Sequence, residues 1–207
     1  MKRLVASLLL ALTFTAVPFA ASLWTPIATK LEQSVVFLEM LDKEGKPAGS
    51  CTGFVVDAAK KHVLTAAHCD AEKVLADGTP TYELFKDERK DLMILRASHV
   101  DRPALKIART DPDRGDEIAS LGYGFGLDDP MFRVAHVSNV RMDIEGLSGP
   151  FVMIDSAFIG GQSGGPVVND KGEVVMIVQR ANDSLGLGVG ATTIRDRVGR
   201  YLAEQVR

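Results

Sequence analysis

The stretch that decides the fold is Gly160-Gly161-Gln162-Ser163-Gly164-Gly165-Pro166, in which glycines stand on both sides of one serine. A serine hydroxyl is a weak nucleophile unless a base takes its proton and nearby N–H groups hold the negative charge created by its attack. Flanking glycines permit a tight turn and keep side chains away from those N–H groups. The stretch therefore predicts a nucleophilic Ser163, with the backbone N–H groups of Gly161 and Ser163 as an oxyanion hole. Taken alone, it would fit an ordinary turn between strands equally well.

Two earlier stretches supply the partners that such a serine needs. Thr65-Ala66-Ala67-His68-Cys69 continues an apolar, partly β-branched run that is typical of a strand, and it places His68 at the end of that strand. Lys90-Asp91-Leu92-Met93-Ile94-Leu95 places Asp91 at the mouth of a second apolar strand. A shielded carboxylate in that position can hold an imidazole in one tautomer. The order histidine, aspartate, serine therefore predicts a catalytic triad.

Other acids and histidines compete for these roles. Asp87 and Glu88 lie in the charged run 86–90, for which we expect a solvated loop, so Asp91 is the favoured acid. His62, His99 and His136 lack comparable neighbours in the sequence, and we interpret them as ordinary core or surface residues.

Together these residues resemble the chymotrypsin-like, or trypsin-fold, serine proteases. The histidine motif is similar to that of the animal enzymes, while the rest of the chain from about residue 34 resembles the protease domain of the bacterial high-temperature-requirement (Deg) proteases. The stretches that carry the second likeness are 50–57, 115–124, 155–157 and 186–190. The resemblance implies an all-β fold of two six-stranded antiparallel β-barrels with a C-terminal helix. It also implies peptide-bond hydrolysis by His68, Asp91 and Ser163 in the cleft between the barrels.

The chain departs from both branches of that family. Animal enzymes usually carry an aspartate before the serine, which binds a newly cut N-terminus, whereas this chain has Gln162. We therefore expect activity without such a cut. Deg proteases carry PDZ modules after the protease domain, whereas only 44 residues follow Ser163 here (207 − 163). We therefore expect a stand-alone protease domain.

The resemblance also suggests a substrate pocket. Its base would be Ala157, six residues before the nucleophile, and its walls would be formed by Ile177, Val178, Gln179, Gly188, Val189 and Gly190. None of these side chains is charged, so we expect small or medium apolar side chains before the scissile bond. Arg180, just beyond this segment, is a candidate for recognising acidic residues farther from the cut.

Composition limits the class of protein. The 207 residues are 46% hydrophobic and 25% charged, with a net charge of −3, which is ordinary for a globular protein. This charge gives no electrostatic basis for binding nucleic acid. Two cysteines and scattered histidines give no metal-ligand pattern. We therefore expect protein or peptide substrates, no nucleic-acid partner, no cofactor and no metal.

The N-terminus reads as a secretory signal peptide over residues 1–22. Lys2 and Arg3 precede an apolar stretch from Leu4 to Val17, and small residues follow at 20–22. The mature domain would then be 23–207, secreted or periplasmic. The alternative is an uncleaved anchor, the only case in which we expect stable membrane association.

The cysteines agree with export. Cys51 and Cys69 flank a predicted hairpin, and in an oxidising compartment we expect a disulfide between them. Two buried free thiols are the alternative.

The chain divides into two barrels, about 34–106 and 115–193, joined by a polar linker over 107–114. A C-terminal helix is predicted over about 195–206 from its apolar spacing, and residues 25–33 could form a short helix or an arm. At least one strand of the first barrel cannot be placed from the sequence.

Two other functions remain open. A catalytically silent binding module could use the same fold, because fold does not determine function. An esterase of another fold would require the order serine, acid, histidine, which is the reverse of the order found here.

Overall fold

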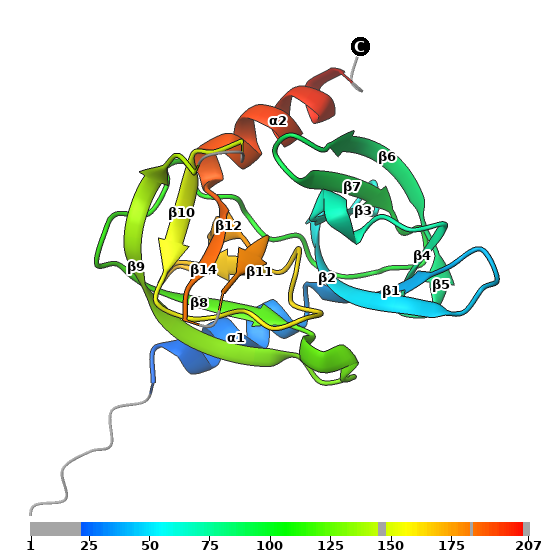
Figure 1. Cartoon of the computed structure of the whole chain (residues 1–207), viewed down its shortest axis with the longest axis horizontal. Coiled ribbons are helices and arrows are strands. Elements are labelled where there is room, and N and C mark those ends of the chain that lie inside the picture. Colours follow the sequence, from blue (N-terminus) through cyan, green and yellow to red (C-terminus); the bar gives the residue numbers. More distant parts are fainter. Residues whose placement is uncertain (1–21, 145–147, 183, 205–207) are drawn as a thin grey trace, which may run out of the picture.

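The computed structural model describes residues 22–144, 148–182 and 184–204. The predicted signal peptide lies almost wholly outside these residues. Within them, no helix is both long and apolar enough to cross a membrane. The main architecture is two antiparallel β-sheets that lie side by side, with one helix near each end of the chain (Figure 1).

The first sheet has seven strands in the order β5-β4-β1-β2-β3-β7-β6. They are β1 (Val35–Leu41), β2 (Pro47–Asp57), β3 (His62–Thr65), β4 (Lys73–Ala76), β5 (Thr79–Pro80), β6 (Tyr82–Asp87) and β7 (Leu92–Arg96). A short 3-10 turn, η1 (Ala67–Cys69), follows β3. Alternation of apolar residues does not reveal β4 and β5, because both strands are short.

The second sheet also has seven strands, in the order β12-β11-β8-β9-β10-β14-β13. They are β8 (Glu117–Gly122), β9 (Met131–Met142), β10 (Phe151–Ile154), β11 (Pro166–Val168), β12 (Val174–Ile177), β13 (Arg180–Ala181) and β14 (Gly186–Val189). Between β8 and β9 lies a second 3-10 turn, η2 (Gly124–Gly126). The all-β class with two antiparallel halves is confirmed, although each half has seven strands where six were predicted.

Two helices pack on this β framework. The helix α1 (Trp24–Glu32) lies against the second sheet, where the indole Nε1 of Trp24 donates to Glu117 at 2.6 Å. The helix α2 (Ala191–Glu204) begins four residues earlier than predicted (195 − 191). Its start is fixed by Asp111 of the linker, which accepts hydrogen bonds from the backbone and hydroxyl of Thr192 at 2.8 and 2.6 Å.

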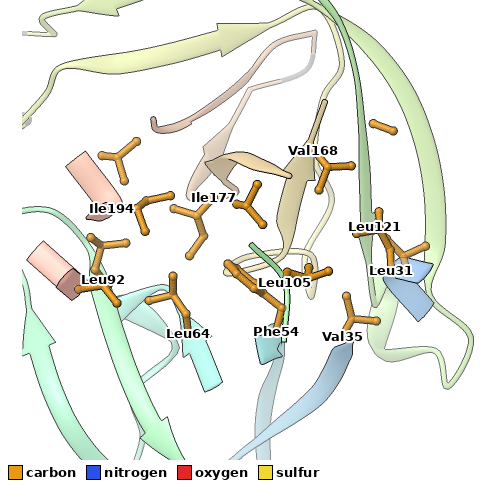
Figure 2. Close-up of a cluster of buried hydrophobic side chains, with 14 of the residues drawn as sticks. Leu31, Val35, Phe54, Leu64, Leu92, Leu105, Leu121, Val168, Ile177 and Ile194 are labelled. Atoms are coloured by element: carbon orange, nitrogen blue, oxygen red, sulfur yellow. The ribbon is translucent and has the colours of Figure 1, made fainter. Parts of the chain in front are cut away.

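A shared apolar core joins the two sheets (Figure 2). Phe54, Leu64 and Leu92 from the first sheet meet Leu121, Val168 and Ile177 from the second, with Leu31 of α1 and Ile194 of α2 added to the same cluster. Each such side chain contributes roughly 1.5–3 kcal/mol when fully buried. The core therefore fixes how the two halves sit against each other, and residues from both halves can form one site.

Candidate active site

His68 is placed by the turn η1, immediately after strand β3. Its backbone N–H donates to Oδ1 of Asp91 at 2.8 Å, and its ring Nδ1 lies 2.8 Å from Oδ2 of the same carboxylate. The side chain of His68 is 44% exposed, whereas that of Asp91 is 14% exposed. One carboxylate thus fixes both the backbone and the ring of a histidine whose other nitrogen remains accessible.

Asp91 is held in an uncommon backbone conformation. Its φ is +52°, in the left-handed region that aspartate tolerates better than most residues. Burial opposes ionisation of its carboxyl, but the hydrogen bonds and charge interaction with His68, helped by the charge of Arg180, outweigh burial and lower its pKa. Asp91 is therefore poised as the anionic partner of His68.

Ser163 lies in a turn that requires glycine at two positions, Gly161 and Gly164. Gly161 has φ +98°, and a Cβ added there would lie 2.2 Å from the carbonyl oxygen of Tyr123. Gly164 has φ +80°, and its Cβ would lie 2.1 Å from Oγ1 of Thr65. The turn is also fastened to the first sheet, because the Ser163 carbonyl accepts a hydrogen bond from the N–H of Thr52 at 2.8 Å.

The peptide between Gly160 and Gly161 has a defined orientation. The Gly160 carbonyl accepts a hydrogen bond from the N–H of Phe125 at 2.8 Å. In a trans peptide the N–H points opposite to the carbonyl, so the N–H of Gly161 faces away from Phe125. Within the described residues, the N–H groups of Gly161 and Ser163 make no hydrogen bond to the protein. Both donors next to Ser163 are therefore available to a ligand.

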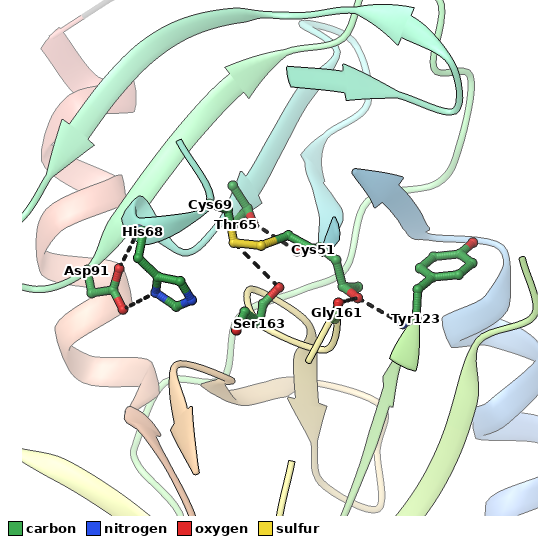
Figure 3. The surroundings of a disulfide bond; sticks show 9 residues. Cys51, Thr65, His68, Cys69, Asp91, Tyr123, Gly161 and Ser163 are labelled. Atoms are coloured by element: carbon green, nitrogen blue, oxygen red, sulfur yellow. Dashed lines mark hydrogen bonds and ion pairs between the residues drawn. A yellow bond between two sulfur atoms is a disulfide. The ribbon is translucent and has the colours of Figure 1, made fainter. Parts of the chain in front are cut away.

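The three predicted triad residues come together on one side of the molecule. Figure 3 shows the His68 ring between Asp91 and Ser163. Within the described residues, no hydrogen bond joins His68 to Ser163. In serine enzymes without substrate, this contact is often long and tightens when substrate binds.

Gln162 takes a structural role in the serine turn. Its side chain is 2% exposed, and its Oε1 accepts a hydrogen bond from the N–H of Ile159 at 3.0 Å. A neutral amide thus braces the turn from within.

The predicted disulfide is confirmed. Cys51 of β2 and Cys69 of η1 are bonded, with an S–S distance of 2.06 Å. Their sulfur atoms and a ring nitrogen of His68 lie within 4.8 Å of one another. Because both sulfurs are in the disulfide, they are not thiolates and do not form a metal-ligand set.

The residues proposed for the pocket lie in different places. Ile177, Val178 and Val189 are packed in the core. Gly188 and Gly190 are packed closely as well, since a Cβ on either would meet Ile177 O or the carboxylate of Asp111. Gln179 is 4% exposed and turns toward the Asp91 segment. The residues at these six positions are therefore buried, and a pocket wall formed by their backbone remains a prediction.

Ala157 alone of the predicted pocket residues is half-buried. Its carbonyl accepts a hydrogen bond from Arg133 at 2.6 Å. The next residue, Phe158, is buried, and its ring lies so close to Gly186 that a Cβ there would be 2.4 Å away. The sequence did not indicate that this ring packs against Gly186.

Sequence reasoning also missed Thr52, which forms hydrogen bonds to the serine turn and to neighbouring segments of both halves of the molecule. Its hydroxyl donates to the Gly161 carbonyl at 2.8 Å and accepts from the N–H of Tyr123 at 2.9 Å, and its carbonyl accepts from the Thr65 hydroxyl at 2.8 Å. The only available signal was a polar residue inside the otherwise apolar segment 51–56.

Asp87 was also misjudged. It is the last residue of β6, not part of a solvated loop, and its side chain is 13% exposed. Oδ1 accepts a hydrogen bond from the N–H of Lys90 at 3.0 Å, and Oδ2 lies 3.3 Å from Nε of Arg197 in α2. It holds the turn before Asp91 and does not contact His68.

Comparisons with known proteins agree with this geometry. Residues 51–177 match the family model of the trypsin-like peptidase domain. The periplasmic pH-dependent serine endoprotease DegQ of Escherichia coli is 27% identical over 185 residues, which cover 81% of this chain and 40% of that protein. The periplasmic serine endoprotease DegP of Salmonella typhimurium is 30% identical over 168 residues, which cover 75% of this chain and 35% of that protein. This chain thus spans well under half the length of these relatives.

Solved structures show the same fold. The Rv3671c protease from M. tuberculosis in its active form aligns with a TM-score of 0.74 and 24% identity over 94% of each chain. An HtrA-type protease, AlgW with tripeptide, aligns with a TM-score of 0.76 and 20% identity, over 89% of this chain and 64% of that one. Because the family model covers more than half of the sequence, this chain belongs to the family of trypsin-like peptidase domains.

Proposed function

We propose that this chain is a serine endopeptidase that uses His68, Asp91 and Ser163 to hydrolyse peptide bonds. The observation that carries the proposal is the pair of 2.8 Å contacts from His68 to Asp91, made beside a serine in a glycine turn. Relatives that match most of this chain are named serine endoproteases, which supports the same reaction.

In the proposed mechanism, Ser163 attacks the carbonyl carbon of a peptide bond while His68 takes the hydroxyl proton. Asp91 holds the ring in place and stabilises the imidazolium. His68 then gives the proton to the leaving amine, which leaves an acyl group on Ser163. Water, activated by the same histidine, releases the acid and restores the serine.

The N–H groups of Gly161 and Ser163 would hold the oxyanion formed at each attack. Two observations support this role: neither donor has a hydrogen-bond partner among the residues that the structure describes, and the Gly160 carbonyl is turned toward Phe125. Fixed donors of this kind commonly contribute the largest part of the rate enhancement.

The site of action would be the periplasm or the exterior of the cell. The charged and apolar pattern of residues 1–22, the Cys51–Cys69 disulfide and the periplasmic relatives all favour export.

The side chain before the scissile bond is proposed to be small and apolar. Ala157 carries no charge, and the only charged side chain that bonds its backbone among the described residues is the cation Arg133. A lysine or arginine would lose water without gaining a partner, whereas each buried CH₂ group contributes about 0.8 kcal/mol. In peptides that differ only at that position, we expect alanine or valine to be cleaved faster than lysine or arginine. Faster cleavage after a basic residue would contradict this preference.

The alternative is a catalytically silent binding module. A fluorophosphonate probe separates the two functions, because only an activated serine reacts with it. We expect the protein to be labelled and a peptide library to be cleaved, with both reactions lost in Ser163→Ala. An unlabelled, folded protein would favour the silent module.

A further inference from the structure

Gln179 occupies an unusual position between the two halves of the site. It lies between β12 and β13 of the second sheet, yet its side-chain amide reaches the segment of the first sheet that carries Asp91. Its Nε2 donates to the carbonyl of Lys90 at 2.6 Å and to the carbonyl of Asp91 at 2.9 Å. One NH₂ group thus holds two successive carbonyls across the boundary between the sheets.

The geometry of Asp91 explains why two carbonyls can share one amide. Its left-handed φ of +52° turns the chain sharply, which a regular strand would not do. Reversing the amide would place Oε1 against both carbonyl oxygens, so the donors can face only this way. Gln179 therefore recognises the turned backbone of Asp91 itself.

The same segment is bonded to the serine turn. The carbonyl of Val178 accepts a hydrogen bond from the N–H of Gly164 at 2.7 Å. The N–H of Val178 donates to the carbonyl of Gly165 at 2.9 Å. These glycines directly follow Ser163. Hydrogen bonds thus connect the serine turn to Val178, the adjacent residue Gln179 to Asp91, and Asp91 to His68.

We propose that Gln179 is a positioning residue that sets the placement of the His68–Asp91 pair relative to Ser163. The proposal rests on the function proposed above and adds to it how the two halves of the site keep their relative positions. Lys90 adds a second tie, since its Nζ bonds the carbonyls of Ser148 and Gly149 in the second half. The Lys90 side chain does not contact the Asp91 carbonyl, whereas the amide of Gln179 bonds it directly.

The central test is Gln179→Leu, which keeps a similar volume but removes both donors. We expect kcat to fall roughly 10- to 100-fold with little change in KM, as for the loss of two hydrogen bonds that position a catalytic group. We also expect the acid limb of the pH profile of kcat/KM to move, because the His68–Asp91 contact loosens. The control is Ile194→Val, a buried change in α2 that lowers stability without touching these hydrogen bonds. It should leave both the kcat and the pH profile of the folded enzyme unchanged.

A measurement independent of turnover separates this inference from the proposed function. In Ser163→Ala protein, proton NMR should show a sharp downfield signal for the His68 ring proton bonded to Asp91. Adding Gln179→Leu should broaden or abolish that signal, whether or not the wild-type chain cleaves peptides. If Gln179→Leu does not fold, Gln179→Asn keeps the amide but is one CH₂ too short to span the gap, and it should give the same losses. Wild-type kcat and an unchanged signal in a folded variant would overturn the proposal.

Discussion

At the residue scale, the two aspartates before β7 have different tasks. Asp91 bonds both the backbone and the ring of His68, whereas Asp87 bonds the Lys90 N–H and pairs with Arg197. Asp91→Asn should therefore lower kcat by about 10⁴-fold, because the imidazole loses its anionic partner and its fixed tautomer. Asp87→Asn keeps an oxygen for the Lys90 N–H and should change kcat only a few-fold. It loses the charge pair with Arg197, which contributes about 1 kcal/mol at most.

Steady-state kinetics of the two variants on one peptide decides between the aspartates. Circular dichroism must show both variants folded. Loss of activity in Asp87→Asn together with normal activity in Asp91→Asn would show that the acid has been assigned wrongly.

The glycines of the serine turn give a second test at this scale. At Gly164, φ is +80° and a Cβ would lie 2.1 Å from Oγ1 of Thr65 and 2.3 Å from the carbonyl of Thr52. Gly164→Ala should lower the free energy of unfolding by more than about 2 kcal/mol, because it adds strain and a clash with backbone atoms. At Gly160 nothing lies within 4 Å of an added Cβ. Denaturant unfolding should show Gly160→Ala within about 0.5 kcal/mol of wild type; equal losses at the two positions would contradict this account.

At the element scale, the disulfide joins the strand β2 to the turn that presents His68. It closes a loop with a sequence separation of 18. In the chain-entropy model, such a loop contributes roughly 3 kcal/mol. The double variant Cys51→Ser, Cys69→Ser should lose about that much stability in urea unfolding. It should also lose activity at temperatures where it is still fully folded, because η1 is no longer tied to β2. Full activity in a destabilised but folded variant would show that the disulfide braces the fold alone.

How much the sequence could predict differs between elements. The strand β7 was predicted from the apolar run that follows Asp91, because a continuous apolar run marks a buried strand. The two-residue strands β5 and β13 were missed, because neither is long enough to show a period. His68, Asp91 and Ser163 could be predicted as a triad because each stands in its own local motif. The sequence suggested Gln179 only as part of a pocket wall. No local pattern shows that its side-chain amide bonds the carbonyl of Asp91 in the other half.

At the scale of the whole molecule, the site depends on the packing of two sheets against each other. Ser163 belongs to the second half, whereas His68 and Asp91 belong to the first. The shared cluster around Phe54, Leu92 and Ile177 provides most of the apolar contact between them (Figure 2). Polar links such as Thr52 N–H to the Ser163 carbonyl then fix the alignment. The two halves of the site are therefore brought together only when the two sheets are packed against each other.

Acid should destabilise the whole molecule in two separate pH ranges. His62 is 2% exposed, and its Nδ1 has no hydrogen-bond partner among the described residues. Burial lowers its pKa from 6.5, with the charges of Lys60 and Arg96 adding to burial and that of Asp57 opposing it. The unfolded chain then binds a proton more readily than the folded one, so this contribution to stability is complete above about pH 6.5 and is lost as the pH falls below it.

Asp91 acts in a lower range and with the same sign. Its burial is outweighed by its bonds to His68, so its pKa lies below 3.8 in the folded protein. The stability that it contributes is present above about pH 4 and is lost as the pH falls through the folded value.

Melting temperatures measured from pH 8 to pH 3 should therefore fall first near pH 6 and again below pH 4. His62→Phe keeps a ring near Tyr201 and should remove the first fall. Between pH 8 and pH 5, its melting temperature should therefore fall less than that of the wild type. Asp91→Asn should leave the first fall in place and weaken the second. A His62→Phe variant that lost stability in parallel with wild type between pH 7 and 5 would show that another group controls that range.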